Sequence, residues 1–157
     1  MKTDSKQDTM KHKRWVGKLM GELIGELEYR AVHHDDSKLE EPEKSLFDEY
    51  SPKLSKCTYG SDEYKKFLKG LKPALDHHYA ENPHHPEHYE DGVDGMDLVD
   101  LLEMICDWLA SSKRHDDGNV YESIKINKKR FNLSDQLCNI LKNTIDHYFE
   151  DVIEEEY

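Results

Sequence analysis

Histidines are the residues of this chain whose number and spacing most clearly indicate chemistry. Ten of the 157 residues are histidine. Seven of them fall in two groups, which are His33 with His34 and then His77, His78, His84, His85 and His88. The imidazole ring is the commonest metal ligand in proteins and changes charge near neutral pH. In the second group, Pro83 and Pro86 stiffen the segment that presents the rings. The clustering indicates that the functional site is built from these two groups.

Three acidic residues form a second candidate set. At about 100° per residue of an α-helix, Asp100, Glu103 and Asp107 share one narrow strip of a strongly apolar segment. Carboxylates in such surroundings are costly unless they are paired or bind a metal. Glu103 has two interpretations: it takes part in catalysis directly, or it orients a histidine that binds the metal.

The cysteine and charge counts exclude several classes of protein. Cys57, Cys106 and Cys138 are odd in number and far apart, which excludes a disulfide framework and a CxxC metal knuckle. Any metal would therefore be held by histidine and carboxylate. The net charge of −12 disfavours binding to duplex nucleic acid, and the basic run 125–130 is expected to be a solvated helix face.

The hydropathy pattern argues against a membrane protein. No stretch approaches the roughly 18 consecutive apolar residues of a membrane span, and the N-terminus lacks the apolar region of a signal peptide. We therefore expect a cytoplasmic protein with no membrane partner.

Helical periodicity without β-type alternation predicts an all-α fold, a compact bundle of five to six helices. We expect a single domain over 1–157 with residues 1–8 disordered. The expected helices cover 9–32, 42–50, a segment beginning after Ser61, 95–113, 119–130 and a segment beginning after Ser134. The inner stripe of the last helix is expected to reach Val152. Loops are expected over 51–60 and 81–95.

The helical period also predicts where particular side chains point. His12 lies one turn before Val16 and is expected to point inward with it. His78 continues the apolar stripe of the third helix, whereas His77 is turned about 100° away from it. Pro73 is expected to kink the third helix or to delay its start.

The order of these residues resembles the motif order of the HD-domain metal-dependent phosphohydrolases: His, then His-Asp, further histidines, then Asp. His34 and Asp35 in the segment RAVHHDDSK resemble the family's HD signature. His12, followed by the apolar Val16, matches the leading histidine. Asp107 in EMICDWLA matches the closing aspartate. The resemblance implies an HD-domain-like helical fold.

Further blocks extend the likeness and mark its departures. The segment HHPEHYEDG, residues 84–92, resembles the HHExxDG piece of the HD-GYP phosphodiesterase branch. The HHDxSK, HHYxxNPHHPEHY and EMICDWLA blocks are also similar to those of a small group of phage and bacterial proteins of unassigned function. Ser37 stands where the HD signature usually has glycine, and the interval between His12 and His34 is short for the family.

The resemblance implies one or two divalent metal ions, drawn from Mn, Fe, Zn, Ni or Mg. The first ion would be held by His12, His34, Asp35 and Asp107. The second would be shared through Asp35 and recruit His77 or His78 and His84 or His85. Around the metals we expect the catalytic groups to be Asp35, Lys38, Glu103 and Glu87, of which Glu103 or Glu87 would orient the water. The expected substrate-binding groups are Lys38, Arg30 and His88, and Lys44 is expected to add to the local positive charge.

The expected function is a metal-dependent phosphohydrolase that hydrolyses a nucleotide or another small phosphoester through a metal-activated water. One alternative keeps the fold and makes the protein an HD-fold di-iron oxygenase. The other is a non-catalytic acidic binding protein of phage origin. The sequence leaves open whether the active form is a homodimer.

Overall fold

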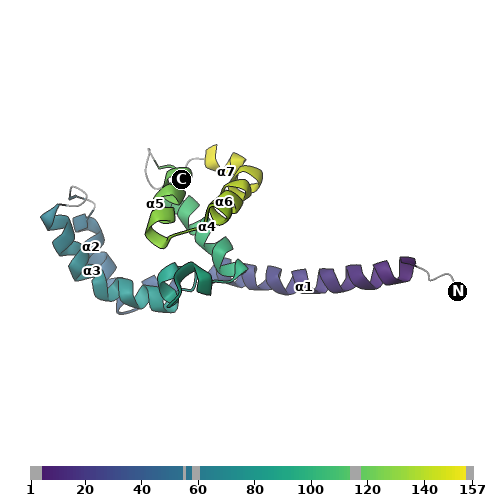
Figure 1. The fold of residues 1–157 in the computed structure, drawn as a ribbon. Coiled ribbons are helices and arrows are strands. Elements are labelled where there is room, and N and C mark those ends of the chain that lie inside the picture. The colour runs from purple at the N-terminus through teal and green to yellow at the C-terminus, as the bar shows by residue number, and fades with distance from the viewer. Residues whose placement is uncertain (1–4, 55, 58–60, 114–117, 155–157) are drawn as a thin grey trace. The chain divides into compact units, whose positions relative to one another are not determined.

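The described regular structure of this protein is entirely helical. The computed structural model describes residues 5–54, 56–57, 61–113 and 118–154, and no strand occurs in these ranges. The α-helices are α1 (Ser5–His33), α2 (Glu43–Leu54), α3 (Asp62–Glu81), α4 (Leu98–Ser112), α5 (Val120–Phe131), α6 (Asp135–Tyr148) and α7 (Glu150–Glu154). Three short 3-10 helices are η1 (Asp36–Leu39), η2 (Pro86–His88) and η3 (Gly92–Gly95). The predicted all-α class is confirmed (Figure 1).

The chain divides into two compact units, residues 1–34 and 35–157. Helix α1 is the described part of the first unit, and all other helices belong to the second. The single domain expected from the sequence stays a prediction.

Several expected boundaries are wrong. Helix α1 begins at Ser5, so residues 5–8 are helical, while residues 1–4 lie outside the described part of the chain. Helix α2 continues through Pro52 to Leu54, so the first four residues of the expected loop are helical. Helix α3 runs through Pro73 from Asp62 onward without a late start. Val152 falls in the separate helix α7, and its side chain lies outside the described atoms.

The second unit has its main apolar core among α4, α5 and α6, which lie together in Figure 1. Helix α4 contributes Met104, Ile105, Trp108 and Leu109, as expected of the most apolar segment. Each such side chain stabilises the fold by about 1.5–3 kcal/mol when it leaves water. Helix α4, which packs into this core, also carries Glu103 and Asp107.

Side-chain caps fix where the helices of the second unit begin. The Ser61 hydroxyl accepts a hydrogen bond from the Tyr64 backbone N–H, and the Ser134 hydroxyl accepts one from Leu137. Both predicted N-caps are therefore confirmed. Helix α4 begins with a capping box in which Asp97 accepts from the backbone of Asp100, whose side chain accepts from the Asp97 N–H.

Gly95 provides a test of how tightly the turn before α4 is packed. A Cβ at this position would lie 2.8 Å from the Tyr89 Cβ atom, which is too close for two carbon atoms. Gly95→Ala should therefore lower the free energy of unfolding by about 1–3 kcal/mol. Urea denaturation followed by circular dichroism measures the change. The matched control is Gly25→Ala in α1, where an added Cβ meets nothing within 4 Å. An unfolding free energy as high for Gly95→Ala as for the wild type would contradict the prediction.

Among the described residues, no helix combines the length and apolar character that crossing a lipid bilayer requires.

Candidate metal centre

Four side chains of the second unit bring metal-binding atoms together. Asp35, His78, His84 and His85 each offer one oxygen or nitrogen atom, and the four atoms lie within 4.8 Å of one another. The Nε2 atoms of His78 and His84 lie 3.4 and 3.6 Å from the Asp35 Oδ1 atom. The Nε2 atoms of His78 and His85 are 2.9 Å apart. Two ring nitrogens at this distance need a shared proton or cation between them, because their lone pairs repel. We call these four residues the donor cluster.

Local backbone geometry places each member of the donor cluster. Asp35 adopts a φ of 60°, a left-handed conformation that Asp tolerates better than most residues, directly before η1. His78 lies in the last turn of α3, and His84 and His85 lie between α3 and η2. His78 is 2% exposed, whereas the His77 side chain is 38% exposed, which confirms the predicted difference in helical phase.

Glu43 orients His78 from the far side of its ring. Glu43 is fully buried at the start of α2, and its Oε2 atom lies 3.0 Å from the His78 Nδ1 atom. Its other oxygen, Oε1, lies 2.7 Å from the His77 Nδ1 atom. A carboxylate accepts hydrogen bonds, so this contact places the His78 proton on Nδ1 and leaves the Nε2 lone pair facing Asp35. The role of Glu43 has no signal in the sequence, where Glu43 stands beside Pro42 as an ordinary acid at the start of a helix.

Glu103 contacts the Nδ1 side of the His84 ring, as Glu43 contacts that of His78. Its Oε1 atom lies 3.1 Å from the His84 Nδ1 atom, and the His84 ring is 1% exposed. The carboxylate favours a proton on Nδ1, so that Nε2 of His84 also turns its lone pair toward Asp35. This contact agrees with the alternative interpretation of Glu103 as a residue that orients a ligand histidine. Its expected catalytic role stays a prediction.

A small polar network closes the end of α3 around His78. The Asn82 side chain donates hydrogen bonds of 2.8 Å to the His78 carbonyl and to the Ser37 hydroxyl. Asn82 is 9% exposed. The network ties η1, which follows Asp35, to the helix that carries His78.

Two further charged groups lie beside Asp35. The Lys38 Nζ atom lies 2.5 Å from the Asp35 Oδ2 atom. A carboxylate oxygen of Asp107 lies within 4.8 Å of one from Asp35. Asp107 reaches this place from α4, so the strip that carries Glu103 and Asp107 faces the donor cluster. Asp100, the third acid of the strip, instead accepts a 2.5 Å hydrogen bond from the Tyr89 hydroxyl.

Burial keeps two of the imidazoles neutral. Burial and then the neighbouring rings of His84 and His78 lower the pKa of His85 from 6.5 to about 3, although Asp107 and Asp35 oppose the change. Burial and then Lys38 lower the pKa of His78, against Asp35 and Glu43. The neutral imidazole is the form that binds a metal ion.

The residues expected from α1 and its end belong to the first unit. His12 is exposed, and no residue of α1 is buried. A single helix has no partner in its own unit to bury such a side chain, so the expectation that His12 points inward stays a prediction. Arg30 forms a 2.8 Å ion pair with Glu26. His34 ends the first unit and directly precedes Asp35 in the chain. The ligand roles of His12 and His34 stay predictions.

Three further residues with expected roles make contacts outside the donor cluster; they are Glu87, His88 and Lys44. The Glu87 side chain pairs with the Arg130 guanidinium at 2.5 Å. His88 is exposed, and its Nδ1 atom lies 2.9 Å from the Tyr79 carbonyl oxygen. Lys44 pairs with Asp48 on the surface of α2. Their expected catalytic and substrate-binding roles stay predictions.

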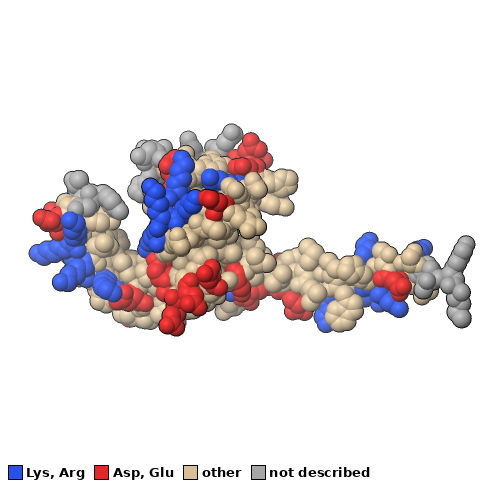
Figure 2. Space-filling model, in the orientation of Figure 1, with Lys and Arg blue, Asp and Glu red and all other residues tan. Residues whose placement is uncertain are grey.

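A groove of 820 Å³ runs between α3 and α5, and basic residues border it. Its cations are Lys65, Lys69, Lys72 and Arg130, and its apolar lining includes Leu68, Leu71, Leu75 and Ile126. Figure 2 shows Lys and Arg gathered over α5 and over the region where α2 ends and α3 begins, although the whole chain is acidic. Tyr79 also lines the groove, and its ring centroid lies 5.1 Å from that of His85. One part of the groove therefore borders the donor cluster.

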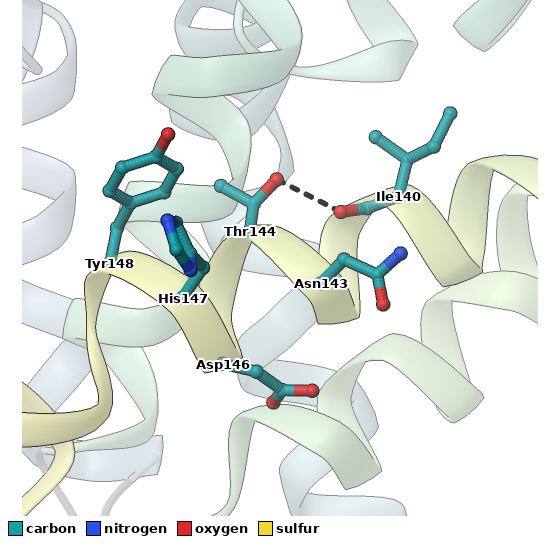
Figure 3. A pocket seen from close by; sticks show the side chains of 6 residues that line it. All are labelled: Ile140, Asn143, Thr144, Asp146, His147 and Tyr148. Carbon is teal, nitrogen blue, oxygen red and sulfur yellow. Dashed lines mark hydrogen bonds between the residues drawn. The ribbon is translucent and has the colours of Figure 1, made fainter.

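A second pocket, of 540 Å³, lies along α6 and shares no lining residue with the donor cluster. Figure 3 shows its six lining residues, all from this one helix, with the Thr144 hydroxyl donating to the Ile140 carbonyl. Asp146 accepts a 2.6 Å hydrogen bond from the Tyr121 hydroxyl. None of the lining residues is a candidate ligand from the sequence.

Comparison with known proteins gives one family. No curated protein and no solved structure matches the chain. The model of a family of unknown function, DUF5662, matches residues 1–147, which is nearly the whole chain. The protein that carries this donor cluster therefore belongs to the DUF5662 family.

Proposed function

We propose that this protein is a metal-dependent phosphohydrolase that acts on a small phosphorylated substrate. The observation that carries the proposal is the donor cluster, in which three imidazoles and the Asp35 carboxylate converge within 4.8 Å. Glu43 and Glu103 stand behind two of the rings, an arrangement typical of histidine ligands to metals. Nitrogen and oxygen donors in this combination suit Mn, Fe, Zn or Ni.

A divalent ion held there would lower the pKa of a water molecule toward neutrality and polarise a phosphoryl oxygen. The hydrolysis adds water across the ester bond. The water oxygen forms the new P–O bond, and the ester oxygen leaves with a proton as the alcohol. Asp107, whose carboxylate lies beside Asp35, would supply a further oxygen ligand to the ion.

The phosphate class of substrate is supported by the cations near the donor cluster. Lys38 lies against Asp35, with 35% of its side chain exposed to receive an anion. The basic groove beside Tyr79 adds a local positive surface to a chain of net charge −12. The HD-like order of His34-Asp35, the later histidines and Asp107 supports the same chemistry.

Metal removal and return test the proposal. Protein made without a His-tag is dialysed against a chelator and then loaded separately with Mn, Fe, Zn, Ni or Mg. Metal content is measured by elemental analysis, and phosphate release is measured for nucleotides, phosphomonoesters and phosphodiesters. We expect one or two equivalents of bound metal and hydrolysis that disappears with the chelator and returns with the metal.

Three other outcomes would overturn the proposal in distinct ways. Bound metal without hydrolysis of any ester would leave a metal site and reject the phosphohydrolase. Two equivalents of iron, with absorbance that changes under oxygen, would favour the di-iron oxygenase. Protein that stays free of metal after reconstitution would favour the acidic binding protein.

Lys38 should affect the substrate more than the metal. In Lys38→Gln we expect a KM about 10–100-fold higher, because a charge-assisted contact to phosphate is lost. Metal content should stay at the wild-type value, since Lys38 offers no metal-binding lone pair when it is protonated. Lys53→Gln is the matched control, because Lys53 is an exposed lysine paired with Glu49 on α2. An unchanged KM in Lys38→Gln would remove Lys38 from the substrate site.

A further inference from the structure

Helix α1 carries an apolar stripe along one face. At about 100° per residue, its members fall within roughly 140° of the helix circumference; they are Val16, Leu19, Met20, Leu23, Ile24 and Leu27. Leu19 is 60% exposed and Leu23 is 51% exposed, and no residue of α1 is buried. A single helix of 29 residues cannot cover its own stripe. An exposed apolar patch of this length is typical of an interaction site.

The charges of α1 are divided between its two halves. Residues 5–18 carry five basic residues and one acidic residue, a net charge of +4, counting histidine as neutral. Residues 19–33 carry three acidic residues and one basic residue, a net charge of −2. Two such helices side by side in the same direction would place like charges opposite each other. In opposite directions, each basic half would face an acidic half.

We propose that two copies of this chain associate through their α1 stripes in antiparallel orientation. The division of charge favours a second copy of the chain as the partner that covers the stripe. The charges of two α1 helices are complementary when the helices run in opposite directions. The opposed helix dipoles favour the same orientation. At roughly 100 Å² for each apolar side chain, six per helix would remove about 1,200 Å² from water, which reaches the range of stable interfaces.

The mass of the full chain in solution tests the association. Light scattering after size exclusion should give twice 18.5 kDa. In Leu19→Glu/Leu23→Glu, which places two charges in the middle of the stripe, we expect a dimer dissociation constant at least about 100-fold higher. The matched control is Met10→Glu/Val32→Glu, which alters two exposed apolar residues of α1 that lie off the stripe. Circular dichroism checks that both variants keep their helical content.

A spin label on α1 tests the orientation. The label is placed at Lys6→Cys in a chain with Cys57→Ser and Cys106→Ser, and Cys138 is retained because it is buried. With 1.5 Å of rise per residue, two antiparallel helices centred near Met20 would separate the labels by about 40 Å. Two parallel helices would bring them to about 10 Å.

Each other result overturns the inference. A wild-type mass of 18.5 kDa at about 100 μM would show that no second copy covers the stripe. A dimer that persists in Leu19→Glu/Leu23→Glu would place the interface elsewhere. A label separation of about 10 Å would reject the antiparallel pairing. None of these readouts depends on metal content or hydrolysis, so the outcome is independent of the proposed function.

Discussion

Asp35→Asn should abolish stoichiometric metal binding, and hydrolysis with it. Asp35 supplies the carboxylate oxygen that lies 3.4 and 3.6 Å from two imidazole nitrogens. The amide that replaces it is similar in size but uncharged, so a divalent ion would lose its anionic ligand. We expect metal affinity to fall by more than about 100-fold, beyond the 10–100-fold typical of losing an outer carboxylate. Elemental analysis of metal-loaded protein after desalting measures the loss.

The control for Asp35→Asn is the same substitution at Asp76. Asp76 is an exposed aspartate of α3 whose carboxylate pairs with Lys72. Asp76→Asn should bind metal as the wild type does. Asp107→Asn should lower metal content as well, because its carboxylate lies beside that of Asp35. Full metal content in Asp35→Asn would show that the donor cluster is not the metal site.

Glu43→Gln should weaken both metal binding and the fold. The Glu43 carboxylate is 0% exposed and contacts the Nδ1 atoms of His77 and His78. A glutamine can accept only one of these two hydrogen bonds, so a buried polar group loses its partner, at a cost of about 1–3 kcal/mol. The freed ring of His78 can also turn its Nε2 atom away from Asp35. We expect metal affinity to fall by about 10–100-fold.

Two measurements separate these effects of Glu43→Gln. Isothermal titration calorimetry gives the metal affinity, and urea denaturation of metal-free protein gives the free energy of unfolding. Glu49→Gln is the matched control, because Glu49 lies on the same helix and pairs with Lys53 in solvent. If the metal affinity of Glu43→Gln equalled that of Glu49→Gln, Glu43 would have no part in orienting the ligand.

The helices could be predicted because their signals are local. The hydroxyls of Ser61 and Ser134 accept from the backbone N–H three residues later, and apolar spacing of three and four residues marks α4 and α6. The end of α2 could not be predicted in this way. Ser51 and Pro52 are typical of a turn, yet α2 continues through them while it packs against α3. Tertiary packing here outweighs the local preference of proline.

The histidines of the donor cluster could be predicted from the sequence, but the contact between Glu43 and His78 could not. His78, His84 and His85 stand out by their spacing, and the helical period correctly separates His78 from His77. The contact of Glu43 with His78 has no such signal, because 35 residues separate them in the chain. Periodicity shows which face of a helix is apolar, and it does not show which other helix lies against that face.

The long sequence separations within the donor cluster also affect how the second unit unfolds. The main apolar core contains residues from α4, α5 and α6 and Leu133 from the segment between α5 and α6, and its described members include none from α2 or α3. A cation bound by Asp35, His78 and His84 would reversibly cross-link the segment before α2 to the end of α3. The cross-link would restrict the unfolded chain over this part of the sequence and so stabilise α2 and α3. The free energy of metal binding would therefore stabilise α2 and α3 more than the core of α4, α5 and α6. Amide hydrogen exchange in α2 and α3 should slow when metal is added, while exchange in the α4–α6 core should change little.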